Sequence, residues 1–369
     1  MKVPVSRQVR ILGTRGVPAA HGGFETFAEH LALFLVLRGW KVVVYCQEDG
    51  AGPIFEDQWE GVDRVRVPVE QSGPKGTVVF DWKCTVHAAR HRDLCLILGY
   101  NTAVFTALLR LRGVRSLINM DGIEWARAKW GTVAKAWFYL NDWAGCWLGH
   151  HLVADHPEIK RHLQTRVWER KITMIPYGAD LVADAPIAPV AALGLEPGRF
   201  LTVIARPEPE NSLLEIVTAF SRQPRGCTLA VLGNYSEENA YHRAVRAAAG
   251  PEVRFLGAIY DKAVVQALRA HSLAYVHGHQ VGGTNPSLVE ALGAGNAVIA
   301  HDNPYNRWVA GEAASYFGSA VQCAEIFDAL LGDAARLAEM RSASRARHAA
   351  AFTWDGTLSQ YEALLMRWL

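Results

Sequence analysis

The residues best suited to chemistry lie close together between positions 281 and 290 of the 369-residue chain. They are glycines, small polar residues and one carboxylate: Gly282, Gly283, Thr284, Asn285, Ser287 and Glu290. Asn285 is a residue type that caps helices, and Pro286 suits a first helical position. A helix that starts directly after a glycine-rich loop points free N–H groups and a positive dipole end toward an anion. The stretch therefore predicts an anion-binding loop, in which Glu290 either accepts hydrogen bonds from ligand hydroxyls or is an ordinary solvated helix residue.

A second glycine-rich segment, residues 13–23, contains Arg15, Gly22 and Gly23. It follows a short apolar run at residues 9–12 and precedes apolar residues that recur at helical spacing from position 24 onward. We expect a strand, a loop and a helix in that order. The chain thus has a second ligand-type loop at the carboxyl end of a strand.

Arg206, Gly233 and Asp121 each stand at or just after the end of an apolar run of strand length. Ligands of α/β proteins bind outside the carboxyl ends of strands, so these positions are candidates for a site. An arginine there offers a bidentate fork to phosphate. The carboxylate of Asp121 is suited to bonding sugar hydroxyls or serving as a base. Its alternative is a turn residue that caps the helix near Glu124.

The elements that must position these residues alternate between strand and helix in both halves of the chain. We expect an α/β protein with two Rossmann-like domains that face an interdomain cleft. The N-terminal domain covers residues 1–183, and the C-terminal domain covers residues 184–351. Residues 183–199 have no clear period and resemble a linker. The C-terminal helix, about residues 352–369, is expected to return to the first domain.

Composition and charge narrow the class of protein. Half of the residues are hydrophobic and a fifth are charged, as in globular chains. A formal net charge of +2 argues against nucleic acid as the main partner, and the first 180 residues are mildly basic at +5. The apolar run at residues 31–37 is far shorter than the roughly 20 residues of a membrane span, and residues 1–12 lack a signal-peptide core. We expect neither a spanning protein nor secretion by that route.

The cysteines and histidines do not predict a metal site. The six cysteines are scattered without C-x-x-C or zinc spacing, which favours a reduced cytoplasmic chain. His87 and His91 are four residues apart, but a solvated helix face is favoured because no carboxylate lies between them. His277 and His279 flank the key loop and are more typical of structural histidines. With no Asp-x-Asp motif either, we expect no metal.

Together these motifs resemble glycosyltransferase family 4, the retaining enzymes of GT-B fold, over the whole chain. The residues that carry the resemblance are Gly22, Gly23, the turn at 175–180, Arg206 and the Glu290 helix. The longer motifs at residues 13–18, 22–25 and 281–287 are similar, more narrowly, to a bacterial rhamnosyltransferase-like subgroup.

The resemblance implies roles for individual residues. Arg206 is expected to bind the donor diphosphate and Glu290 the nucleotide ribose, and Asp121 joins them as a catalytic candidate. Gly22 and Gly23 let the backbone approach the phosphates, since glycine has no side chain to block them. The full set of expected donor-binding residues is Gly22, Gly23, Arg15, Asn211, Gly233, Gly282, Gly283, Thr284, Asn285, Ser287 and Glu290.

Three positions depart from the family pattern. Gly282 replaces a glutamate that contacts the donor sugar, so sugar contacts are expected from backbone, Thr284 or Asn285. Asn211 replaces a lysine of the phosphate site, for which Arg15 is a substitute. Asp121 stands at or beside the position of a sugar-contacting histidine, and we expect it to act on the transferred sugar. We interpret these departures as a change of donor sugar.

The expected function is metal-independent, retaining transfer of a hexose from a nucleoside-diphosphate sugar, without a further cofactor. The narrower resemblance favours rhamnose from a deoxythymidine diphosphate donor. The expected acceptor is a lipid-linked saccharide or an oligosaccharide in surface polysaccharide synthesis, bound by the N-terminal domain. The alternatives are a GT-B nucleotide-sugar epimerase and a non-catalytic nucleotide-sugar-binding protein.

Residues 125–147 mix tryptophans with arginine and lysine. One interpretation is a core helix. The other is a face that contacts the membrane surface peripherally. The second interpretation agrees with the basic N-terminal half and with a cytoplasmic enzyme at the inner face of the cytoplasmic membrane.

Overall fold

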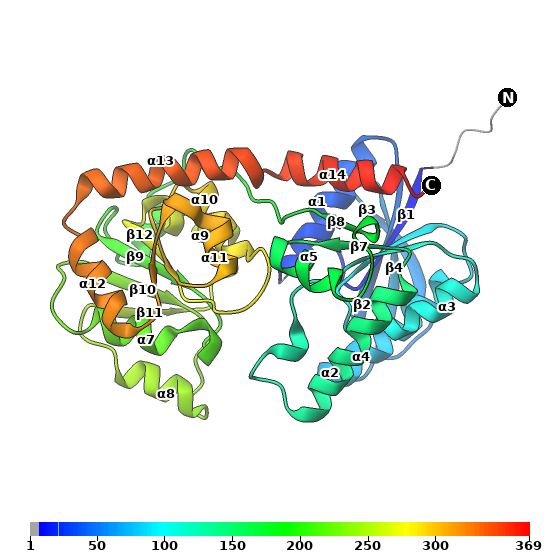
Figure 1. The fold of residues 1–369 in the computed structure, drawn as a ribbon, viewed down its shortest axis with the longest axis horizontal. Helices are drawn as coiled ribbons and strands as arrows, with labels where there is room; N and C mark the ends of the chain where they lie inside the picture. Colours follow the sequence, from blue (N-terminus) through cyan, green and yellow to red (C-terminus); the bar gives the residue numbers. More distant parts are fainter. Residues whose placement is uncertain (1–6, 21) are drawn as a thin grey trace. The chain divides into compact units, whose positions relative to one another are not determined.

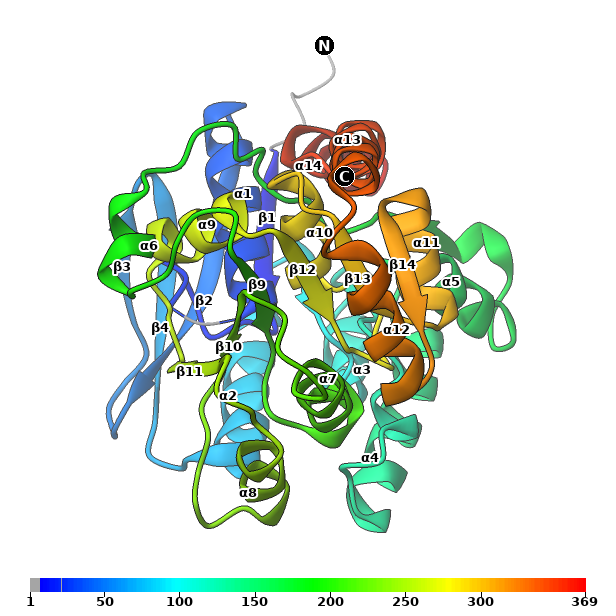
Figure 2. The same cartoon turned by 90° about the vertical axis from the view of Figure 1, so that its left-hand side faces the viewer.

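The computed structural model describes residues 7–20 and 22–369. Residues 1–6 and His21, a member of the first glycine-rich segment, lie outside the described residues. The chain divides into two compact units. Unit 1 consists of the described residues up to Pro176 together with Asp355–Leu369, and unit 2 consists of Tyr177–Trp354. Each unit is a twisted sheet covered by helices (Figures 1 and 2).

Unit 1 is built on an eight-stranded sheet in the order β3-β4-β2-β1-β5-β6-β7-β8. The strands are β1 (Gln8–Leu12), β2 (Lys41–Asp49), β3 (Phe55–Trp59), β4 (Val62–Val69), β5 (Leu94–Leu98), β6 (Ser116–Asn119), β7 (His151–Ala154) and β8 (Ile172–Met174). All neighbouring pairs are parallel except β3 and β4. The central strands are buried along most of their length, which explains their continuous apolar runs.

The hairpin of β3 and β4 at the edge of this sheet was not predicted from the sequence. β3 has the sequence Phe-Glu-Asp-Gln-Trp and is largely exposed, so no buried apolar run marks it. The turn between the strands is Glu60-Gly61, and the glycine is its only mark in the sequence. In the structure the two residues have φ values of 49° and 79°. Two consecutive positive φ angles are typical of the tight turns that join antiparallel strands.

The helices of unit 1 are α1 (Gly23–Leu37), α2 (Gly73–Ala88), α3 (Thr106–Leu111), α4 (Thr132–Leu148), α5 (Pro157–Gln164) and α14 (Trp354–Met366). Short 3₁₀ turns are η1 (Ala103–Phe105), η2 (Glu124–Ala126) and η3 (Glu169–Lys171). α14 is bonded to the rest of unit 1. Asn119 Nδ2 donates to Tyr361 Oη at 2.9 Å, and Trp40 Nε1 donates to Glu362 Oε1 at 3.0 Å. The end of the chain therefore stabilises the sheet of the unit in which the chain begins.

Unit 2 contains a parallel six-stranded sheet in the order β11-β10-β9-β12-β13-β14. The strands are β9 (Phe200–Ile204), β10 (Thr228–Leu232), β11 (Val253–Gly257), β12 (Ala274–His277), β13 (Val298–His301) and β14 (Ala314–Phe317). The helices are α6 (Ala188–Ala192), α7 (Leu213–Phe220), α8 (Ala240–Ala247), α9 (Lys262–His271), α10 (Pro286–Gly293), α11 (Pro304–Ala310), α12 (Ala320–Leu330) and α13 (Ala334–Ala351), with 3₁₀ turns η4 (Pro209–Asn211) and η5 (Gly311–Ala313).

The segment expected to be a linker, residues 183–199, is partly ordered structure. It contains the short helix α6, and Val190 and Leu195 are buried against the sheet of unit 2. Such a short helix is not detected in an alanine- and proline-rich segment, because too few large apolar residues are present to show a helical period.

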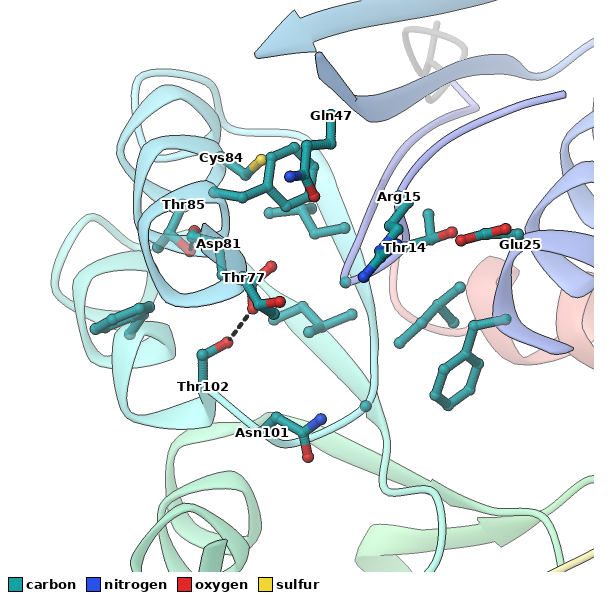
Figure 3. Close-up of a pocket in the computed structure, with 18 of the residues that line it drawn as sticks. Thr14, Arg15, Glu25, Gln47, Thr77, Asp81, Cys84, Thr85, Asn101 and Thr102 are labelled. Carbon is teal, nitrogen blue, oxygen red and sulfur yellow. Dashed lines mark hydrogen bonds between the residues drawn. The ribbon is translucent and has the colours of Figure 1, made fainter. Parts of the chain in front are cut away.

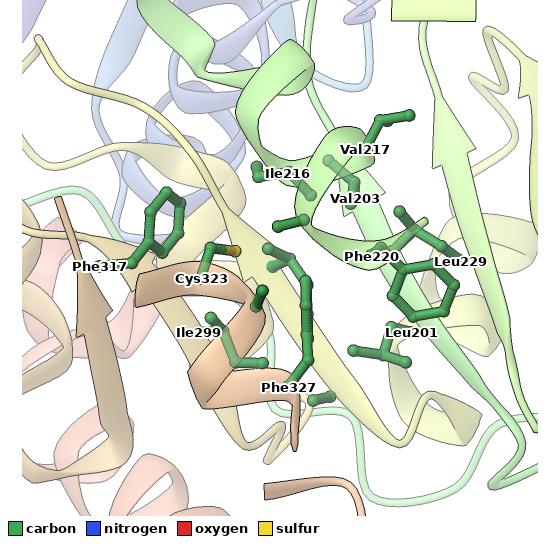
Figure 4. Packing of buried hydrophobic residues seen from close by; sticks show 14 of the residues in the cluster. Leu201, Val203, Ile216, Val217, Phe220, Leu229, Ile299, Phe317, Cys323 and Phe327 are labelled. Atoms are coloured by element: carbon green, nitrogen blue, oxygen red, sulfur yellow. The ribbon is translucent and has the colours of Figure 1, made fainter. Parts of the chain in front are cut away.

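The main core of unit 2 lies between one face of its sheet and the helices α7 and α12 (Figure 4). Phe220 of α7 and Phe327 of α12 meet edge to face, with ring centroids 5.4 Å apart at 90°. Leu201 and Val203 from β9 and Ile299 from β13 belong to the same core. This core fixes the carboxyl ends of β9 and β12, where the candidate residues of unit 2 lie.

Candidate functional site

In unit 1 the candidate residues gather where β1 and β5 end side by side. The two strands pair in parallel, so the loops that follow Leu12 and Leu98 lie at the same edge of the sheet. Gly13 has φ 81°, and a Cβ atom there would lie 2.2 Å from the carbonyl oxygen of Leu98. Only glycine lets the first loop cross this close to the neighbouring strand.

A cavity of about 290 Å³ opens between these loops, the start of α1 and the helix α2. Its apolar lining includes Phe24, Phe80 and Phe105. Its polar lining includes Thr14, Arg15, Glu25, Gln47, Thr77, Asp81, Thr85, Asn101, Thr102 and Thr106. Figure 3 shows Thr77, Asp81 and Thr102 grouped on one side, with Thr14, Arg15 and Glu25 on another. The cavity combines hydroxyls, an amide, charged groups and aromatic rings, which suits a small polar ring.

Asp81 is the most unusual group in this cavity. Thr102 Oγ1 donates to its Oδ2 at 2.8 Å. Burial raises the pKa of Asp81 to about 6, although the hydrogen bond from Thr102 acts in the opposite direction. A carboxyl group that titrates near neutrality in a cavity is a functional candidate. The sequence analysis missed it, although Thr77, Asp81 and Thr85 recur at a spacing of four, which places them along one face of α2.

Arg15, Gly22 and Gly23 of the first predicted loop all line this cavity. Among the described residues, the exposed Arg15 side chain has no hydrogen-bond or ion-pair partner. Gly22 has φ 103°, and an added Cβ would meet no atom within 4 Å. Its backbone conformation therefore explains the glycine, and the space in front of it is open.

Asp121 follows β6, which is the neighbour of β5 in the sheet. Its φ of 52° is unusual for a residue with a side chain, and its amide donates to Asn119 Oδ1 at 3.0 Å. Asn119 in turn donates to Tyr361, so one amide side chain fixes the Asp121 loop to α14. The amide of Glu124, which a capping aspartate would satisfy, donates instead to Tyr100 Oη at 2.8 Å. Asp121 thus stands in a fixed, unusual backbone conformation outside the cavity lining.

In unit 2 the candidate residues follow three adjacent parallel strands, β10, β9 and β12. The loops are bonded to each other: Ser212 Oγ donates to the carbonyl of Gly278 at 2.8 Å, and the amide of Gln280 donates to the carbonyl of Glu210 at 2.9 Å. A Cβ at Gly233 would lie 2.5 Å from the carbonyl oxygen of Ala205. Gly233 therefore serves close packing between two loops.

Arg206 follows β9, and its side chain is exposed and unpaired among the described residues. Asn211 is buried, and its Nδ2 donates to the carbonyl oxygen of Arg206 at 2.8 Å. Asn211, at the position where the family pattern has a lysine, thus stabilises the turn that contains Arg206. Its amide supports the arginine's backbone and adds no charge of its own.

The key loop and helix have the predicted local form. α10 begins at Pro286, and the Asn285 side chain caps it by accepting from the amide of Ser287 at 3.0 Å. Gly282 has φ 137°, a conformation that favours glycine, and Thr284 is buried. The loop therefore directs the first amides of an eight-residue helix out of the sheet edge.

Glu290 is part of a buried polar network. Arg269 Nη2 lies 2.5 Å from Glu290 Oε2 and donates to Ser287 Oγ at 3.2 Å. Tyr275 Oη lies 2.5 Å from the same Ser287 hydroxyl. The side chain of Arg269 is 5% exposed and that of Glu290 is 36% exposed. Arg269 thus fixes one carboxylate oxygen and leaves the other side of Glu290 open. Arg269 lies in the last turn of α9, and nothing in the sequence of that turn distinguishes it from a surface arginine.

The histidine pairs at 277/279 and 87/91 contact other aromatic side chains rather than a metal-binding arrangement. The rings of His277 and His279 are stacked, with centroids 4.3 Å apart, and burial holds the pKa of His277 well below its usual value. His87 Nδ1 lies 3.0 Å from Tyr45 Oη, and its ring is 5.3 Å from that of His91. No group of three or more His, Cys, Asp or Glu side chains in the described ranges is arranged to hold a metal ion.

Comparison with known proteins gives the fold a name. Residues 6–180 match a family model described as a domain of unknown function, DUF1972. No curated protein matches this chain in sequence. Among solved structures, the chain is similar to the sucrose-phosphate synthase of Thermosynechococcus elongatus, with a TM-score of 0.81, 17% identity and 98% of both chains covered.

Two further structures support this result. Anabaena HepE in complex with UDP has a TM-score of 0.75 at 15% identity, with 98% of this chain and 100% of that chain covered. A glycosyltransferase from Rickettsia africae has a TM-score of 0.72 at 13% identity, with 98% of both chains covered. The chain therefore has the GT-B fold with two Rossmann-like sheets, and the predicted fold class is confirmed. At these identities the likeness shows the fold alone.

Proposed function

We propose that this protein is a glycosyltransferase that uses a nucleoside-diphosphate sugar. The observation that carries the proposal is the arrangement in unit 2, where an unpaired arginine and a fixed carboxylate follow adjacent strands around a helix N-terminus. The two groups match the two halves of a nucleoside diphosphate: a polyanion and a ribose. HepE, which shares the fold, is bound to UDP, and this agrees with the proposal.

Each donor contact has a physical basis in this unit. Arg206 offers a bidentate fork to the diphosphate, and the first amides of α10 supply further donors. Glu290 accepts from ribose hydroxyls through the side that Arg269 leaves open. Gly282, Gly283, Thr284 and Asn285 present backbone and side-chain groups to the sugar. Ser287 acts indirectly, since its hydroxyl is engaged by Tyr275 and Arg269.

Unit 1 contributes the remaining proposed roles. Gly22 has open space in front of its backbone, and both Gly22 and Gly23 line the cavity at the start of α1, where they let a phosphate approach. Arg15 supplies a cation that has no side-chain partner among the described residues. Asp121 acts on the transferred sugar from its fixed loop. The transferred group is a hexose, with rhamnose favoured by the motif resemblance, and the acceptor is a saccharide or lipid-linked saccharide. Transfer with retention follows from the same resemblance.

Charge on the leaving diphosphate is stabilised by Arg206 and the N-terminus of α10, so we expect activity to survive chelation. Turnover that EDTA abolishes and a divalent ion restores would contradict this part of the proposal. The measurement is product formation at matched ionic strength, with and without the chelator.

The proposal is tested first by binding. Thermal-shift titration with UDP, dTDP and GDP should raise the melting temperature, because a ligand that binds only the folded state stabilises it by mass action. No shift with any of them would overturn it. Product analysis then separates activities: a new donor isomer without acceptor indicates an epimerase, and binding without hydrolysis or transfer indicates a non-catalytic binding protein.

We also propose peripheral membrane contact through one face of α4, called here the α4 stripe: Val133, Trp137, Leu140 and Trp147. These side chains are 86%, 37%, 65% and 62% exposed. Their spacing places them on one face of the helix. The opposite face buries Asn141, Asp142, Gly145 and Cys146 against unit 1. The helix therefore has its apolar side outward.

Cationic groups flank both ends of the α4 stripe. Lys129 Nζ lies 4.7 Å from the centroid of the Trp130 ring near the first turn of α4. At the last turn, Arg110 Nη1 donates to the carbonyl of Leu148 at 3.0 Å, and Lys171 Nζ donates to that of Cys146 at 2.7 Å. Tryptophans with flanking cations suit the interface of an anionic bilayer. No helix in the described part of the chain combines the length and hydrophobicity that a membrane crossing requires.

Flotation with phosphatidylglycerol-containing vesicles tests this contact at low salt. Leu140→Asp should reduce binding, because it places a charge on the stripe. Leu37→Asp, at an exposed leucine of α1 away from the stripe, is the control. Absence of flotation by the parent protein would overturn the contact. A dimer that Leu140→Asp dissociates, without flotation, would assign the stripe to a second copy of the chain.

A further inference from the structure

We propose that the cavity of unit 1 binds an uncharged, hydroxyl-bearing sugar ring, and that Asp81 and Thr102 are the residues that select it. The inference rests on the proposed function only in identifying this sugar as the acceptor. Binding of a neutral sugar to the cavity can be tested without any donor.

The position of Asp81 is set by the packing of α2. Phe80 and Cys84 are buried against the sheet, and Asp81 lies beside them on the adjoining row of the helix. Thr102, the residue before η1, donates to Oδ2 from the same side of the cavity (Figure 3). The carboxylate is thus held by one hydroxyl and retains acceptor capacity toward the space in front of it. Two cis- or vicinal hydroxyls are the donors that such a carboxylate accepts best.

The shape and lining of the cavity favour one ring. Its volume of about 290 Å³ is at the lower end of the roughly 300–1,000 Å³ of small-molecule sites. Phe24 and Phe105 supply apolar surface for the C–H face of a sugar. Thr77 and Asn101 supply further hydrogen-bonding groups around the ring.

The charges of the cavity disfavour a phosphorylated sugar. Two carboxylates, Glu25 and Asp81, line the cavity together with one arginine, Arg15. A phosphate monoester carries about −1.5 to −2 charges near neutrality, and on the side of the cavity that Asp81 and Thr102 line it would lie close to the Asp81 carboxylate. Like charges in a partly buried site repel strongly because the effective dielectric constant is low. A neutral ring avoids this repulsion and still satisfies Asp81.

The pKa of Asp81 gives the inference a second readout. Burial raises this pKa to about 6, and hydroxyl donors favour the ionised form. Neutral-sugar affinity should therefore fall as pH drops through about 6. Among the residues that the structure describes, the other titratable or charged groups that line the cavity are Arg15 from the loop after β1, Glu25 from α1 and Cys84 from α2. Burial raises the Cys84 pKa well above its usual value, so this thiol does not titrate in the same range.

The experiment is saturation-transfer NMR and calorimetry of the full chain with methyl rhamnoside, methyl glucoside and methyl mannoside, each compared with glucose 6-phosphate. At least one neutral glycoside should bind, glucose 6-phosphate should bind on the order of tenfold more weakly or not at all, and the pH profile should have a midpoint near 6. Glucose 6-phosphate binding as tight as that of the best glycoside would overturn the inference, as would absence of binding by all three glycosides.

Variants separate selection from a merely structural role. Asp81→Asn keeps the shape and the bond from Thr102, so it should fold, lose on the order of tenfold in glycoside affinity and lose the pH midpoint. Thr102→Val should shift the midpoint upward, because it removes the bond that lowers the Asp81 pKa. Asp63→Asn, on β4 outside the cavity, is the matched control. An unchanged profile in Asp81→Asn would overturn the role of Asp81. Failure of nucleotides to bind would overturn the proposed function and leave this result standing.

Discussion

The carboxylates of the two units differ in their charged partners. In unit 1, the Asp81 carboxylate accepts from the hydroxyl of Thr102 and has no ion-pair partner among the described residues, and burial raises its pKa to about 6. In unit 2, Glu290 is ion-paired with the buried Arg269. The two units share one architecture, a wholly or largely parallel sheet with a glycine-rich loop at a strand end. The chemistry of each site is therefore set by the single partner that each carboxylate is given. A cation fixes orientation, whereas a neutral hydroxyl leaves the charge sensitive to ligand and pH.

The largest effect is expected from removing Arg269, the cation that pairs with Glu290 in unit 2. Arg269→Ala should lower the free energy of unfolding by about 2 to 4 kcal/mol, because it leaves the Glu290 carboxylate and the Ser287 hydroxyl without their buried partner. Nucleotide affinity should fall as well, since Glu290 loses its fixed orientation. Urea denaturation measures the first effect. A loss below about 0.5 kcal/mol would show that the pair behaves as a surface ion pair.

A second substitution separates binding from stability in unit 2. Arg206→Ala should weaken nucleoside-diphosphate binding by roughly 1.5 to 3 kcal/mol, the range for charge-assisted bonds. Stability should be unchanged, because the side chain is exposed and has no partner in the part of the chain that the structure describes. Calorimetry measures the affinity, and Arg336→Ala on α13 is a control that removes another exposed arginine. Equal affinities for both variants would exclude Arg206 from the phosphate site.

A third substitution extends the comparison to the loop after β6. Asp121→Asn removes a charge but keeps the shape, so the variant should melt nearly like the parent and bind nucleoside diphosphate normally. If Asp121 acts on the sugar, turnover should fall at least tenfold, a barrier change of roughly 1.4 kcal/mol. Steady-state kinetics provide the measurement. Near-parental turnover would make Asp121 a residue of the turn, held there by Asn119.

Much of the fold was predictable because its strands are buried on both faces and are continuously apolar. The α10 region was predicted in detail, since Asn285, Pro286 and the glycines act through local backbone rules. The hairpin of β3 and β4 and the helix α6 were missed, because β3 is polar and largely exposed and α6 is too short to show an apolar period.

The site was predictable only where local sequence determines it. Arg269 comes from α9 and Thr102 from the loop after β5, and each meets its carboxylate through tertiary packing. Asn211 was expected at the phosphate site because of its place in a motif, but its amide bonds the carbonyl of Arg206. Sequence identifies residues that can do chemistry, whereas the partners that tune them come from elements distant in the chain.

The last prediction applies one chemical change, carboxylate to amide, to both units. The raised pKa of Asp81 means that the folded state binds its proton more tightly than the unfolded state does. Its contribution to stability is therefore present below about pH 4 and is lost as pH rises through about 6. Asp81→Asn should be more stable than the parent at pH 7 by about 1 to 3 kcal/mol, and the difference should vanish near pH 4.

Glu290→Gln should have the opposite sign at pH 7. It leaves the buried guanidinium of Arg269 without its counter-charge, so we expect a loss of about 1 to 2 kcal/mol. Urea denaturation of both variants and the parent at pH 4, 5, 6 and 7 measures the two effects side by side. If both variants are destabilised at pH 7, Asp81 is a structural carboxylate and the contrast between the units fails. Opposite signs would show that the ionised Asp81 lowers the free energy of unfolding, as expected of a carboxylate whose role is to bind a ligand.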